Sequence, residues 1–149
     1  MAVWYQTLIG QHPNYETLAA DVATSMISLL KVNAPSVNFQ VLDATIITQR
    51  KRKFVVLCCF CLPYLSNEES IQLTVDCYRL LQDGRIFYFS FIENDCENRN
   101  FKLSVYFHQE DYLQQALKAS GFAIVHLLRN EYLKPNSAYN THLNFIVRK

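Results

Sequence analysis

The chain has 149 residues, of which 50% are hydrophobic and 13% aromatic, and its formal net charge is +1. Such a chain can bury a real core, which excludes an intrinsically disordered protein. Its nearly neutral charge argues against a dedicated nucleic-acid binder, because such proteins are usually strongly basic. The longest apolar runs, such as 54–62, are too short to span a bilayer. We therefore expect one globular domain, 1–149, without a membrane partner.

The cysteines indicate the cellular compartment of the protein. Their number is odd and three lie in one apolar run, which is the spacing of neither a disulfide framework nor a zinc site: Cys58, Cys59, Cys61, Cys77 and Cys96. In a strand, Cys59 and Cys61 would face one way and Cys58 the other. The chain opens without the pattern of a secretory signal. Reduced, buried thiols and no signal favour the cytoplasm.

The first part of the chain predicts a strand, a helix and a strand. We expect a short strand over 18–22, a helix over 25–33 and a second strand over 37–42. Asp21 and Asp43 stand at or near the ends of these strands. The helix carries apolar side chains that should face inward, namely Met26, Ile27, Leu29 and Leu30.

A second unit of the same kind follows. Ser66 and Glu69 have the spacing of a capping box, so a helix should begin here and end at Gly84, where a positive φ costs least. The runs 54–62 and 85–92 on either side are rich in aromatic and branched residues, as in strands that are buried on both faces. This order predicts a parallel sheet covered by helices. The basic run 50–53 is interpreted as a solvated loop, with a nuclear signal or a phosphate contact as the alternative.

The last third of the chain predicts one more helix and two strands. A polar loop over 93–100 comes first, and a helix over 110–121 begins with acids and ends at a glycine. Strands are expected over 122–128 and 141–147. The turn between them, 136–140, is too short for a helical crossover, so the two strands should pair antiparallel.

In their order and spacing, these elements resemble the class I S-adenosylmethionine-dependent methyltransferases that act on small molecules, from about Leu18 to Lys149. The resemblance implies an α/β, Rossmann-like sheet that is mostly parallel and has a final antiparallel strand. It also implies S-adenosylmethionine as the cofactor and a small-molecule substrate. The segments that carry it are Ala20–Met26, Asn38–Ala44, Val56–Leu65, Leu80–Arg85 and Ser120–Phe122.

The resemblance also assigns residues to the cofactor. In such enzymes an acid at the end of the second strand binds the ribose hydroxyls, and one at the third strand holds the adenine amino group. The matching positions are Asp21 and Asp43, and both lie at strand ends, where ligands of open α/β sheets bind. The implied cofactor-binding residues are Asp21, Val22, Asp43, Ala44, Cys59 and Phe60.

The sequence offers candidate residues for the acceptor pocket but no candidate catalytic group. Methyl transfer from a sulfonium needs little acid–base help, so positioning can supply most of the acceleration. We expect His126 and His142 on a sheet surface, because the histidines lack the spacing of a metal site. The candidate substrate-binding residues are Tyr64, Glu93, Tyr106 and His108.

The chain departs from this family at the glycine-rich turn that follows the first strand. Only Gly10 precedes Asp21, and a missing first strand would leave two edges unpaired inside the sheet. Either residues 2–9 fill this place, or the chain is a fragment or a degenerate relative. The alternative function is therefore a non-catalytic, methyltransferase-like module that forms homo-oligomers or binds a partner. A nucleic-acid enzyme that uses the run 50–53 is a weaker alternative.

Overall fold

The structure is a computed structural model that describes residues 18–33, 35, 37–45, 53–59, 61–93, 99–100, 105–133 and 139–149. The chain divides into two units, residues 1–47 and residues 48–149. The predicted single domain therefore stays a prediction. The predicted strand over 2–9, the basic residues 50–52, Phe60 and Cys96 lie outside the described residues.

The first unit is the predicted strand–helix–strand. Strands β1 (Leu18–Asp21) and β2 (Asn38–Val41) pair in parallel, and α2 (Thr24–Asn33) connects them. The prediction that Met26 and Leu29 face inward is wrong, because they are 39% and 57% exposed. Two strands are too narrow to cover a wide apolar stripe of a helix, so only part of it is buried. The small core consists of Ala19, Ile27, Leu30, Val37 and Phe39.

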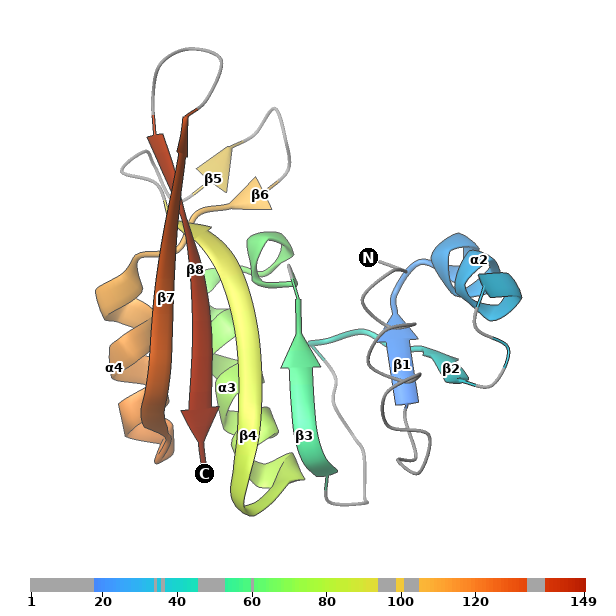
Figure 1. Cartoon of the computed structure of the whole chain (residues 1–149), viewed down its shortest axis with the longest axis horizontal. Coiled ribbons are helices and arrows are strands. Elements are labelled where there is room, and N and C mark those ends of the chain that lie inside the picture. The colour runs from blue at the N-terminus through green and yellow to red at the C-terminus, as the bar shows by residue number, and fades with distance from the viewer. Residues whose placement is uncertain are drawn as a thin grey trace. The chain divides into compact units, whose positions relative to one another are not determined.

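The second unit is built on a four-stranded sheet in the order β3-β4-β8-β7. Its strands are β3 (Lys53–Cys58), β4 (Leu81–Glu93), β7 (Ala123–Leu133) and β8 (Tyr139–Arg148). β3 and β4 are parallel, and β8 lies antiparallel between β4 and β7. β3, β4 and β7 therefore run in one direction, which confirms the mostly parallel sheet with a final antiparallel strand (Figure 1).

Helix α3 (Asn67–Leu80) begins at the predicted capping box. The Glu69 N–H donates to Oγ of Ser66 (3.2 Å), and the Ser66 N–H donates to Oε2 of Glu69 (2.7 Å). The predicted end at Gly84 is wrong, because the helix stops at Leu80 and β4 begins at the next residue. Gly84 lies in β4 with φ +76°, and its N–H donates to the carbonyl of Lys149 (2.9 Å).

Helix α4 (Glu110–Ser120) has both predicted ends. Two acids occupy its first turn, and Gly121 closes it in the left-handed conformation with φ +98°. The N–H groups of Gly121 and Phe122 donate to carbonyls of the last turn, both at 3.0 Å. A side chain at Gly121 would also meet the ring of Tyr78, since a Cβ atom there would lie 2.9 Å from it.

The core of the second unit lies between the sheet and its two helices, α3 and α4, which cover the same face (Figure 1). Phe87, Phe89 and Phe91 alternate along β4 toward these helices and are fully buried, and Phe145 of β8 stacks on Phe89 with centroids 5.0 Å apart. Burial of both faces was predicted and is wrong for β3, where Val55 and Leu57 are 52% and 42% exposed. Helices cover only one face within this unit.

The remaining elements are short. The strand predicted over 54–62 ends at Cys58, and the 3-10 helix η1 (Leu62–Tyr64) follows it. Strands β5 (Arg99–Asn100) and β6 (Val105–Tyr106) form a small antiparallel pair. The predicted turn over 136–140 lies largely outside the described residues. No helix in the described ranges is long and apolar enough to cross a membrane.

Candidate functional site

Two carboxylates stand at one edge of the first unit. β1 and β2 are parallel and Asp21 pairs in register with Val41, so both strands end at the same edge. Asp21 is the last residue of β1, and Asp43 follows β2 by two residues. The structure therefore brings together the two acids that the sequence assigned to the ribose and the adenine.

Local hydrogen bonds orient both carboxylates. Oδ1 of Asp21 accepts from the Ala23 N–H (2.8 Å), and Oδ1 of Asp43 accepts from the N–H and the hydroxyl of Thr45 (both 2.8 Å). The hydrogen bonds from Thr45 hold the pKa of the Asp43 carboxyl below its ordinary value. Within the described part of the chain, no donor is bonded to Oδ2 of either residue. Each group thus has an oriented oxygen left to accept hydrogen bonds.

The end of β3 carries the cysteine-rich turn. The strand stops at Cys58 and the backbone turns into η1, which brings the side chains of Cys58 and Cys61 into hydrogen-bonding contact. The expectation that they face opposite ways is wrong, because it assumed a strand through residue 62. This hydrogen bond and burial raise the pKa of the Cys58 thiol well above its ordinary value. Cys59 is exposed at the same strand end.

A cavity of about 360 Å³ opens in the second unit at this edge of the sheet. Its position follows from the topology, because β4 ends here and the antiparallel β8 begins here, with Glu93 opposite Thr141. The cavity unites two of the four predicted substrate-binding residues, Tyr64 and Tyr106. Its described lining consists of Pro63, Tyr64, Ile92, Val105, Tyr106, Phe107 and Asn140.

Glu93 lies next to this cavity but is engaged in the fold. Its Oε1 accepts from the N–H of Glu110 (2.8 Å), so it caps the first turn of α4, where Gln109 contributes no side-chain cap. Glu110 in turn forms an ion pair with Arg129 of β7. The substrate role of Glu93 stays a prediction, and the geometry favours a structural role.

His108 is likewise engaged. It is 1% exposed, and its Nε2 lies 2.8 Å from the carbonyl of Leu62. A carbonyl only accepts, so Nε2 donates to Leu62, while Nδ1 lies 3.0 Å from Oδ1 of Asn67. Burial lowers the pKa of His108. The ring joins η1, α3 and the segment before α4, so the geometry again favours a structural role over the predicted contact with substrate.

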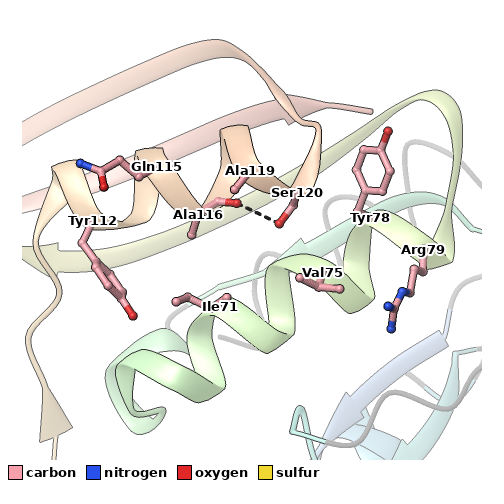
Figure 2. A pocket seen from close by; sticks show the side chains of 9 residues that line it. All are labelled: Ile71, Val75, Tyr78, Arg79, Tyr112, Gln115, Ala116, Ala119 and Ser120. Carbon is pink, nitrogen blue, oxygen red and sulfur yellow. Dashed lines mark hydrogen bonds between the residues drawn. The ribbon is translucent and has the colours of Figure 1, made fainter.

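A larger groove, of about 530 Å³, runs between α3 and α4 (Figure 2). Ile71 and Val75 of α3 line it together with Ala116 and Ala119 of α4. The hydroxyl of Ser120 at one end donates to the carbonyl of Ala116 (2.8 Å). This groove lies between the helices and not at the strand ends, where ligands of this architecture bind, so the smaller cavity is the better candidate site.

No group of three His, Cys, Asp or Glu side chains that could hold a metal ion occurs in the parts of the chain that the structure describes. His126 is exposed on β7, as predicted, and His142 is partly buried on β8. The cavity residues Phe107 and Asn140 were not predicted. Asn140 precedes Thr141, which pairs with Glu93 at the end of β4, and no local signal marks such a residue.

The fold is that of class I S-adenosylmethionine-dependent methyltransferases. An S-adenosylmethionine-dependent methyltransferase from Methanosarcina mazei superposes with a TM-score of 0.77 at 14% identity, and the match covers 96% of this chain and 86% of that one. A putative sarcosine dimethylglycine methyltransferase from Galdieria sulphuraria gives 0.80 at 7% identity, over 99% and 75% of the two chains.

A third structure of the same fold holds a ligand. It is the magnesium protoporphyrin IX methyltransferase from Synechocystis with bound SAH, with a TM-score of 0.65 and 17% identity, and the match covers 89% of this chain and 64% of that one. No model of a known protein family and no curated protein matches the sequence. The likeness therefore concerns the fold.

Proposed function

We propose that the chain binds S-adenosylmethionine and transfers its methyl group to a small-molecule acceptor. The observation that supports this most is the pair of carboxylates, Asp21 and Asp43, at the ends of two adjacent parallel strands. In open α/β sheets, ligands bind at this edge. The methyltransferase fold and the bound SAH of the Synechocystis enzyme point to the same class of cofactor.

The adenosine half of the cofactor fits these side chains. The hydrogen bond from Ala23 orients the carboxylate of Asp21, and a carboxylate can accept from two neighbouring hydroxyls, as on ribose. Asp43, whose pKa the hydrogen bonds from Thr45 lower, is a charged acceptor at neutral pH, which suits the adenine amino group. We place Val22, which is 67% exposed, and Ala44 beside the adenosine as apolar contacts.

The methionine half has less support from the described residues. The two described glycines, Gly84 and Gly121, lie in β4 and after α4, and Gly10 lies outside the described residues. When bound, the cofactor would supply a methyl group on a sulfonium, whose neutral thioether is a leaving group that needs no acid catalysis. What the chain itself contributes is binding and positioning, and in the second unit the cavity of Tyr64 and Tyr106 would take the acceptor.

Isothermal titration calorimetry with S-adenosylmethionine and with SAH tests this proposal. We expect saturable binding of both, and Asp21→Asn should weaken it at least about tenfold, because a charge-assisted hydrogen bond contributes about 1.5–3 kcal/mol. Asp111→Asn is the matched control, since it makes the same chemical change at an exposed position of α4 and should leave the affinity unchanged. No heat from either ligand at millimolar concentration would refute the proposed function.

A non-catalytic, self-associating module is the second candidate, and the edge of β3 favours it. Among the described strands β3 pairs only with β4, so within the described part of the second unit its other edge can accept another strand. Val55 and Leu57 on this strand are exposed apolar residues. Light scattering over a range of concentrations tests this candidate, with Leu57→Lys expected to reduce association. A protein that stays monomeric throughout contradicts it.

A further inference from the structure

We infer that the strand-end cavity, lined by Tyr64, Tyr106 and Phe107, takes an uncharged, planar aromatic ligand. That this ligand is the methyl acceptor rests on the proposed function. The binding preference itself follows from the shape, lining and charge of the cavity, whose described lining residues all belong to the second unit.

The size of the cavity limits the ligand to a small molecule. Its volume of about 360 Å³ lies near the lower end of the range for small-molecule sites, which is roughly 300–1,000 Å³. A molecule of one or two fused rings fits such a space, whereas a macrocycle or a long chain does not. Tyr64 is 69% exposed at η1, so its ring can close over a ligand that has entered.

The walls favour an aromatic ligand. Three of the described lining residues are aromatic, and Pro63, Ile92 and Val105 add flat or branched apolar surface. Aromatic side chains gain from offset-stacked or edge-to-face contacts with another ring, in addition to the burial of apolar area. A purely aliphatic ligand would bury similar area without this contribution.

The neutral polar groups of the described lining favour an uncharged ligand. Every polar group among the described lining residues is neutral, namely the phenols of Tyr64 and Tyr106 and the amide of Asn140. Glu93, which follows the lining residue Ile92 in the sequence, carries a carboxylate. This carboxylate accepts a hydrogen bond from the N–H of Glu110 and so caps α4. A carboxylate or ammonium ligand would lose its hydration without gaining an ion pair from these residues, which is costly.

Three probes that share the naphthalene ring and differ in charge test the inference: 2-naphthol, 2-naphthoate and the 2-naphthylmethylammonium ion. Their dissociation constants are measured with the full chain by ligand-detected NMR at pH 7, without the cofactor. We expect 2-naphthol to bind at least tenfold more tightly than either ion. Tyr64→Ala should weaken its binding about two- to tenfold, and Tyr64→Phe should retain it, since the ring is kept.

Tyr112→Ala is the matched control, because Tyr112 lines the groove between α3 and α4 and not this cavity. It should leave the dissociation constant within twofold of wild type, and circular dichroism melts verify that each variant folds. The inference is overturned if no probe binds, if either ion binds as tightly as 2-naphthol, or if both alanine variants weaken binding equally. Tighter binding of the ammonium would instead assign an aromatic cage for cations.

The outcome is separate from that of the proposed function. Selective binding of 2-naphthol together with no binding of S-adenosylmethionine would retain the aromatic site and refute the methyltransferase. Binding of S-adenosylmethionine without any preference for 2-naphthol would retain the proposed function and refute the aromatic site.

Discussion

Replacing His108 with phenylalanine tests whether this residue is structural. The substitution keeps a planar ring against Phe91, on which the imidazole packs edge-on with centroids 6.1 Å apart. It removes both ring nitrogens, and with them one donor to the Leu62 carbonyl (2.8 Å), which also accepts from the Leu65 N–H (2.9 Å), and the longer contact to the Ser70 hydroxyl (3.4 Å). Leu62 is 1% exposed and Ser70 is fully buried, so water cannot replace the lost partner without a rearrangement.

The cost follows from these contacts. The Leu62 carbonyl keeps the Leu65 N–H, so the Ser70 hydroxyl is the buried group that loses its side-chain partner. Such a loss costs about 1–3 kcal/mol, so His108→Phe should lower the free energy of unfolding by about 1–3 kcal/mol. At roughly 2–4 °C per kcal/mol for a chain of this size, the melting temperature should fall by roughly 2–12 °C. His126→Phe is the control: His126 is exposed on β7, and its replacement should change stability by less than about 0.5 kcal/mol.

The same histidine predicts a dependence of stability on pH. Burial lowers the pKa of His108 in the folded state, although hydrogen bonds to the backbone of Leu62 and Leu65 oppose the shift. The unfolded chain therefore binds a proton more readily, at the ordinary pKa of about 6.5. The contribution is fully present above pH 6.5 and is lost as the pH falls through the folded pKa, and urea titrations should show a smaller loss in His108→Phe. Equal stability and equal pH dependence in variant and wild type would refute the structural role.

Two further predictions concern a glycine and the thiols. Gly121→Ala should lower the free energy of unfolding by about 2–4 kcal/mol in urea titrations, because φ is +98° and the new Cβ would lie 2.9 Å from the Tyr78 ring. Gly84→Ala, with φ +76° and open space around the new Cβ, should lower it by only about 1 kcal/mol, and equal losses in the two variants would contradict the clash. Iodoacetamide should label the exposed Cys59 far faster than Cys77, whose burial raises the pKa of its thiol. Mass spectrometry measures the two rates, and faster labelling of Cys77 would contradict the prediction.

Elements with local signals could be predicted from the sequence. The capping box of Ser66 and Glu69 and the stop at Gly121 depend on residues within one helical turn, so their chemistry is visible in the sequence. The antiparallel pairing of β7 with β8 followed from the short link between them. The two acids of the first unit were assigned from the resemblance to the methyltransferases, which matches them to strand ends.

Features that depend on distant partners could not be predicted. The run 54–62 is apolar throughout, so nothing in it marks the end of β3 at Cys58 or the turn into η1. Glu93 is paired with a backbone group 17 residues away, and His108 with one 46 residues away. A sequence shows that such residues stand near a strand end, but it does not show that a helix terminus or a carbonyl already occupies them.

The four predicted substrate-binding residues thus fall into two pairs with different roles. Glu93 and His108 hold α4, η1 and α3 in place around the strand-end cavity, whereas Tyr64 and Tyr106 line it. A site is accurate only when rigid neighbours support the side chains that touch the ligand. Substitutions in the first pair should therefore lower stability and binding together, while Tyr64→Ala should lower binding alone. This difference would separate the residues that shape the cavity from those that select its ligand.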